Sequence, residues 1–126
     1  MAIVDLILFP HFVVMLIAII LFSVSISMVA LHKPKNWLLL HKFFASLGLL
    51  TGIIALILLG GLVLEILHGI LGLVSIISFT AIIVIGLVAI YKKDKNVRKI
   101  HIWLSRIIYI LSLFLIVLGI VTFLFF

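Results

Sequence analysis

Cysteine is absent from this sequence of 126 residues. Without it the chain has no disulfide framework, no thiolate-bound iron–sulfur cluster and no thiolate-bound zinc. Histidine, which occurs five times, is therefore the strongest remaining ligand for a transition metal, alongside three methionines.

Charged side chains are also scarce. They make up 10% of the chain, against about 25% in ordinary soluble domains, whereas hydrophobic side chains make up 68% and the mean hydropathy is +1.70. A soluble domain of this length still exposes much of its surface to water and could not hide so much apolar area. The composition therefore predicts an integral membrane protein whose solvent is the lipid bilayer.

Long apolar runs predict an all-α fold in a single transmembrane domain over residues 1–126. The expected helices cover about residues 6–31, 38–59, 66–90 and 100–126. Each run has the ~20 residues that a helix needs to cross roughly 30 Å of hydrocarbon. Three breaks separate the runs: a polar segment around Pro34, the Gly60-Gly61 pair, and a charged loop from Tyr91 to Lys99. Connections this short predict a four-helix bundle that runs up, down, up and down.

The basic residues predict the orientation of this bundle. All nine lie in or beside the first and third connections, whereas the opposite side of the membrane has only Asp5 and Glu65. Because loops rich in lysine and arginine stay in the cytoplasm, we expect a multi-pass cell-membrane protein with both termini outside. The formal net charge of +6 then reflects membrane topology and not nucleic-acid binding.

Four of the five histidines fall within the predicted spans, one in each helix. Ionisable residues are costly in lipid and therefore indicate function. His11 and His68 lie at the outer ends of their helices, and we name them the outer pair. His41 and His101 lie at the inner ends and form the inner pair. Each pair comes from helices that lie diagonally opposite in the expected bundle.

The division into two levels indicates which metal group fits. A single zinc or copper ion would need all its imidazoles at one level, because metal–nitrogen bonds are only about 2 Å long. Two imidazoles per level suit two b-type haems, with the levels roughly 20 to 28 Å apart. Covalent haem attachment is excluded because it requires cysteine. With both axial positions filled, the expected chemistry is one-electron transfer.

Two glycines follow a histidine at an interval of eighteen residues: Gly86 follows His68, and Gly119 follows His101. Eighteen residues make five turns, so glycine and histidine share a helix face about 27 Å apart. A glycine at that point would give clearance to a porphyrin bound at the other level. Helix packing alone is an equally good explanation, because small residues are common where membrane helices meet.

Basic residues near the inner pair are expected to partner the haem propionates. The candidates are Lys42, Arg98 and Arg106. Arg106 is the sharpest case, because it lies inside an apolar run and must reach the interface or an anionic partner. The alternative is that these charges only set topology and contact lipid headgroups.

Three segments resemble the cytochrome b561 family of di-haem membrane cytochromes: His41 to Gly52, His68 to Gly72, and Arg98 to His101. The resemblance covers nearly the whole chain and lies in the spacing of histidines more than in any long motif. It implies one haem on each histidine pair and electron transfer across the membrane. Eukaryotic members carry two further flanking helices, and the smaller bacterial members are associated with quinol oxidation.

Two alternatives stay open at this point. The chain could be the cytochrome b anchor subunit of a larger respiratory complex, with a redox partner protein as electron donor in place of quinol or another small reductant. It could also be a haem-free transporter subunit or assembly module, whose histidines serve protons or packing. Whether it acts as an oxidoreductase such as a quinol oxidase, and whether it forms a homo-oligomer, the sequence leaves undecided.

Overall fold

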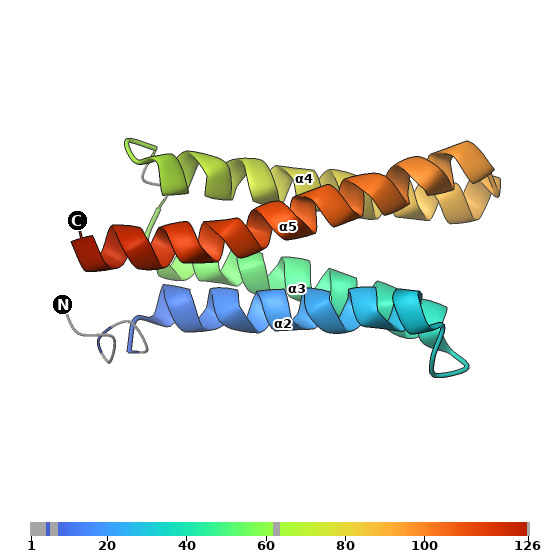
Figure 1. Cartoon of the computed structure of the whole chain (residues 1–126), viewed down its shortest axis with the longest axis horizontal. Helices are drawn as coiled ribbons and strands as arrows, with labels where there is room; N and C mark the ends of the chain where they lie inside the picture. Colours follow the sequence, from blue (N-terminus) through green and yellow to red (C-terminus); the bar gives the residue numbers. More distant parts are fainter. Residues whose placement is uncertain (1–4, 6–7, 62–63, 126) are drawn as a thin grey trace. The chain divides into compact units, whose positions relative to one another are not determined.

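The computed structural model describes residues 5, 8–61 and 64–125, and within them it contains helices and turns but no strands. The helices are α2 (Pro10–Leu31), α3 (Trp37–Leu58), α4 (Leu67–Lys92) and α5 (Lys95–Phe125), labelled in Figure 1. All four are long and apolar enough to cross a membrane. The all-α membrane fold expected from the composition is therefore confirmed.

The first three helices follow the predicted ranges closely. α2 begins at Pro10, directly after an extended Phe9, because the fixed φ of proline suits a first turn where its missing N–H costs no hydrogen bond. The ends of α3 and α4 lie within two residues of the expected positions. The predicted first residue of the first helix, Leu6, and last residue of the fourth, Phe126, lie outside the described residues.

The fourth helix differs from the prediction. α5 starts at Lys95, five residues before the expected position, so most of the expected charged loop is helical. Asp94 explains the difference, because its Oδ1 accepts hydrogen bonds from the backbone N–H groups of Asn96 (2.7 Å) and Val97 (3.2 Å). Such a cap satisfies donors that the first helical turn leaves without a partner. Only Lys93 and Asp94 remain between α4 and α5.

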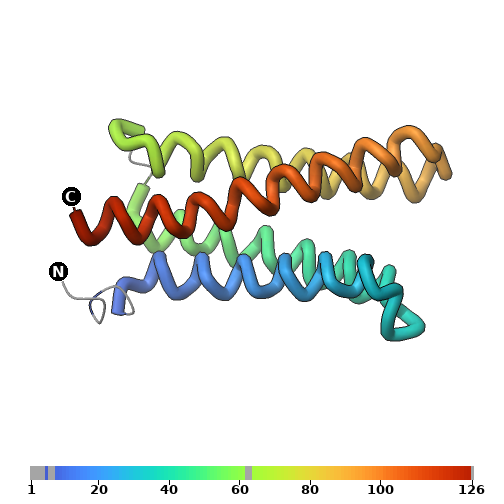
Figure 2. Tube along the Cα trace, in the orientation of Figure 1, coloured from blue at the N-terminus to red at the C-terminus, as the bar shows by residue number. Residues whose placement is uncertain are grey.

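The chain divides into two compact units. Unit 1 comprises Met1–Leu62 with Ile120–Phe126 and contains α2 and α3, while unit 2 comprises Val63–Gly119 and contains α4 with most of α5. The helices of each unit are consecutive in the chain and antiparallel, as the trace in Figure 2 shows. Each unit is therefore built on one helical hairpin.

The seam of the first hairpin repeats every seven residues on both helices. The facing pairs are His11 with Ala55, Ala18 with Gly48, and Ser25 with His41. A Cβ on Gly48 would lie 3.2 Å from the ring of Phe22 and 3.3 Å from the carbonyl oxygen of Ala18. Small residues thus let α2 and α3 approach closely, as is common where helices meet in lipid.

The second hairpin has a seam of the same kind. His68 packs against Gly119, and His101 packs against Gly86. The buried α4 residues Ser75, Ile82 and Ala89 follow His68 at successive intervals of seven. A seven-residue repeat keeps one face of each helix turned toward its neighbour.

Polarity inside the hairpins is the reverse of that in a soluble domain. The buried polar residues among those described are all serines: Ser25, Ser75 and Ser112. Large apolar side chains point outward instead, for example Ile57 at 71% exposed and Ile110 at 66%. A surface of this kind is stable only in an apolar solvent, so the fold itself supports a bilayer environment.

Candidate functional site

The four histidines within the spans lie toward the ends of the two hairpins. His11 is the second residue of α2 and His41 the fifth of α3, so they lie at opposite ends of the first hairpin. His68 and His101 are likewise near the start of α4 and α5. All four are half-buried, whereas His32, in the turn after α2, is exposed. The structure therefore separates the four from the fifth in the way that the sequence predicts.

Backbone carbonyls fix the ring orientation of two of these histidines. Nδ1 of His11 lies 2.9 Å from the carbonyl oxygen of Ala55, and Nδ1 of His101 lies 2.9 Å from that of Ile82. A carbonyl oxygen only accepts, so Nδ1 carries the hydrogen and donates it. A neutral imidazole in this tautomer has its lone pair on Nε2, which is the usual arrangement in histidines that bind a metal.

His41 is held by a serine on the facing helix. Its Nδ1 lies 2.7 Å from Oγ of Ser25 and 3.2 Å from the carbonyl oxygen of the same residue. The hydroxyl of Ser25 donates to the carbonyl oxygen of His41 at 3.0 Å, so its oxygen accepts from the imidazole. This arrangement again places the hydrogen on Nδ1 and the lone pair on Nε2.

Gly86 and Gly119 make room for imidazole rings from the neighbouring helix of the second hairpin. A Cβ on Gly86 would lie 2.7 Å from Cε1 of His101, and a Cβ on Gly119 would lie 2.9 Å from Cε1 of His68. Both distances are below those that real Cβ atoms adopt. The sequence suggested these glycines as clearance for a porphyrin, whereas the contacts that the structure gives them are with the histidine rings.

Ser25 and Ala55 are the equivalent positions in the first hairpin, and the sequence analysis did not single them out as contacts of the histidines. Each is fourteen residues after a histidine on its own helix, and each faces the histidine of the other helix. The interval of fourteen residues from a histidine to a small residue, which occurs on both helices, is the sequence signal that would have indicated these two positions. Every one of the four imidazoles therefore lies against a small residue of the neighbouring helix.

The interval from each histidine to the small residue that faces the other histidine gives the distance between the two histidines of a hairpin. This interval is fourteen residues in the first hairpin and eighteen in the second. Fourteen residues correspond to about 21 Å along a helix, and eighteen to about 27 Å. The histidines of one hairpin are therefore too far apart to bind one metal ion together. Each hairpin offers two separate candidate ligands.

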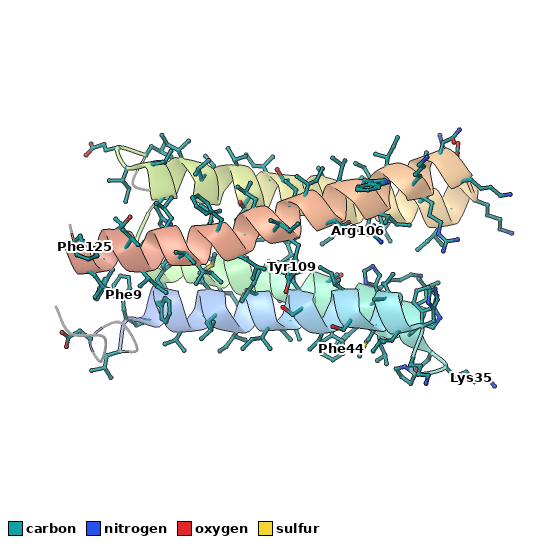
Figure 3. All side chains as sticks on the ribbon, in the orientation of Figure 1. Phe9, Lys35, Phe44, Arg106, Tyr109 and Phe125 are labelled. Carbon is teal, nitrogen blue, oxygen red and sulfur yellow. The ribbon has the colours of Figure 1, made fainter. Side chains whose placement is uncertain are left out.

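The three basic candidates lie near the histidines of the inner pair in the sequence but differ in their surroundings. Lys42 is half-buried and next to His41, while Arg98 is exposed in the first turn of α5, three residues before His101. The guanidinium of Arg106 lies 5.5 Å above the ring centre of Trp103, one turn away on α5 (Figure 3). A cation–π contact of this kind accommodates a cation within an apolar stretch.

An aromatic cluster covers the end of the first hairpin at His11. The ring of Phe9 meets that of His11 edge-on at 6.1 Å between centroids and lies 5.9 Å from the ring of Phe123. Figure 3 labels Phe9 just before α2. Apolar rings around a ligand limit the access of water, which in turn influences the reduction potential of a bound metal.

Comparison with known proteins shows the family of this chain. The family model for eukaryotic cytochrome b561 matches residues 5–126, which is almost the whole chain. The chain belongs to the cytochrome b561 family. Cytochromes b561 transfer electrons across membranes by means of b-type haem. No curated protein and no solved structure matches this chain.

The residues of this cytochrome fit a b-type haem. A b-type haem is held by axial ligands without a covalent bond, and imidazole is a common axial ligand. His11, His41 and His101 have Nδ1–H groups anchored to oxygen, which leaves Nε2 as the ring nitrogen that carries a lone pair. Imidazoles in this tautomer can serve as axial ligands of haem iron.

Proposed function

We propose that this cytochrome b561 carries electrons across the membrane through two b-type haems. In this proposal the outer pair, His11 and His68, ligates one iron, and the inner pair, His41 and His101, ligates the other. Residues 1–126 act as one transmembrane domain. The basic connections face the cytoplasm, and both termini lie outside.

The observation that carries this proposal is that the chain provides equivalent imidazoles near both ends of each hairpin. Each lies against a small residue of the facing helix: Ala55, Ser25, Gly119 or Gly86. Four imidazoles, two from each hairpin, match the ligands of two bis-histidine haems, whereas a single haem would leave two of the four without a role. Family membership supports haem as the ligand but not the number of haems.

When bound, each haem would supply one-electron redox chemistry. The protein does the rest. Its imidazoles would hold the two haems at separate levels, because the two histidines of each hairpin are about 21 to 27 Å apart along the helices. Its exposed apolar side chains, with lipid outside them, keep water and ions from the path between the two levels.

The basic residues near the inner pair act on the charge of the bound groups. We propose that Lys42, Arg98 and Arg106 partner the propionates of the inner haem, since charge-assisted hydrogen bonds to carboxylates are strong. Quinol or another small reductant is the proposed donor, with a redox partner protein as the alternative. The family resemblance supports quinol or another small reductant as the donor.

Haem content tests the proposal directly. Purified from haem-replete cells, the chain should contain about two b-type haems, measured as the ratio of pyridine haemochrome to protein. His41→Ala should retain about half of that content, because it removes one axial ligand of one haem. His32→Ala is the matched control, since His32 is exposed outside the spans, and it should retain all of it. A wild-type ratio of one haem per chain, or equal loss of both haems in His41→Ala, would overturn the two-haem proposal.

A further inference from the structure

Ser25 is the most deeply buried polar residue in the described part of the chain, at 1% exposed. Its hydroxyl joins α2 to α3 by two hydrogen bonds. Oγ accepts from Nδ1 of His41 at 2.7 Å and donates to the carbonyl oxygen of His41 at 3.0 Å. Both contacts are to the same residue, so Ser25 holds the backbone and the ring of His41 together.

Other hydroxyl groups in these helices behave differently. Serine and threonine in a helix commonly donate to the carbonyl oxygen four residues earlier, which satisfies the hydroxyl within its own helix. Among the described residues, this contact is made by Ser23, Ser27, Thr51, Ser78, Thr80, Ser105 and Ser112. Ser25 instead directs its hydroxyl across the hairpin to a histidine.

The contact also distinguishes His41 from two other histidines of the site. His11 and His101 donate to a backbone carbonyl oxygen at 2.9 Å. His41 has a hydroxyl oxygen as its nearer acceptor at 2.7 Å and a carbonyl oxygen at 3.2 Å. The nearer acceptor of His41 is therefore closer to Nδ1 than the acceptor of His11 or His101, and a closer acceptor polarises the N–H bond more.

We propose that Ser25 is a positioning residue that lowers the reduction potential of the haem bound by His41. This inference rests on the proposed function. An acceptor at Nδ1–H increases the electron density that the imidazole donates through Nε2, which stabilises the oxidised iron. The hydrogen bonds also fix the plane of the ring. Ser25 thereby makes the inner haem electronically different from the outer one.

Ser25→Ala tests this inference. The substitution removes the hydroxyl and leaves a carbonyl oxygen as acceptor, which is the arrangement of His11 and His101. We expect both haems to be retained and the potential of one of them to rise. The reduced-to-oxidised ratio of that haem at a fixed ambient potential should increase about threefold to tenfold, where tenfold corresponds to about 59 mV for one electron.

Redox titration and electron paramagnetic resonance of the oxidised protein are the measurements. The signal that changes should be the one that disappears in His41→Ala, because the hydroxyl of Ser25 no longer helps to fix the plane of that imidazole. Ser23→Ala is the matched control, since Ser23 lies two residues away on α2 and donates to the carbonyl oxygen of Ile19. It should leave both potentials and both signals unchanged.

The outcomes separate this inference from the proposed function. Two retained haems with unchanged potentials and signals in Ser25→Ala would overturn the role of Ser25 and leave the two-haem proposal intact. Loss of the inner haem would also overturn it, because Ser25 would then be needed for binding. Full haem content in His41→Ala would instead overturn the proposed function itself.

Discussion

At the scale of single residues, the contact between a histidine and a small residue of the facing helix is the recurring feature of this chain. Gly86 gives the closest case, because any side chain there meets the ring of His101. Glycine in a helix is less favourable than alanine by roughly 0.5–1 kcal/mol. The close approach of the imidazole explains why glycine stands at this position in spite of that cost.

Gly86→Ala should therefore displace His101 and weaken one haem site. We expect the haem content to fall from about two per chain toward about one, or one absorbance band to shift if the displaced ring still binds. Gly72→Ala is the matched control on the same helix, since a Cβ at Gly72 has nothing within 4 Å. Unchanged haem content, potentials and spectra in Gly86→Ala would show that the ring contact does not position the ligand.

At the scale of elements, Asp94 determines where α5 begins. The sequence predicted a charged loop because lysines and arginines dominate residues 92–99. Charge alone does not prevent a helix outside the hydrocarbon, and a carboxylate that accepts from two backbone N–H groups favours one. The helix therefore extends through Arg98, and the connection to α4 is tight.

Asp94→Ala should lower the stability of the second hairpin by about 0.5–2 kcal/mol, the usual cost of removing a helix cap. Denaturant-induced unfolding in detergent micelles, followed by circular dichroism, measures the change. Asp94→Asn is the control, because its side-chain oxygen still accepts the two hydrogen bonds, and it should stay close to wild type. Equal destabilisation by both substitutions would assign the effect to charge and not to capping.

At the scale of the whole molecule, the nine basic residues predict the topology. The chain contains no cysteine, so single cysteines can be introduced and labelled without removing native ones. We expect Lys35→Cys in intact cells to be protected from an impermeant thiol reagent and Glu65→Cys to be labelled. Lys35 lies in the connection between α2 and α3, as Figure 3 shows. The opposite labelling pattern would invert the orientation and with it the assignment of outer and inner pairs.

The amino-acid sequence by itself determined the solvent, most of the secondary structure and the candidate ligands. A chain with 68% hydrophobic side chains has no stable fold in water, and runs of this length allow little besides spanning helices. Histidine is the candidate ligand that the sequence offers, because cysteine is absent. The sequence also identified two of the four small residues that the imidazole rings contact, Gly86 and Gly119, because each follows a histidine by eighteen residues.

Only the tertiary structure decided what those small residues do. The register of an antiparallel hairpin depends on how two helices pack, so spacing along one helix does not reveal which residue faces it. The packing of the helices places Gly86 against His101 and Ser25 against His41. As a result, the hydroxyl of Ser25 forms hydrogen bonds with His41 and not with a carbonyl oxygen of its own helix. Hydrogen bonds across a seam are a property of two helices together, which is why one helix read alone could not predict them.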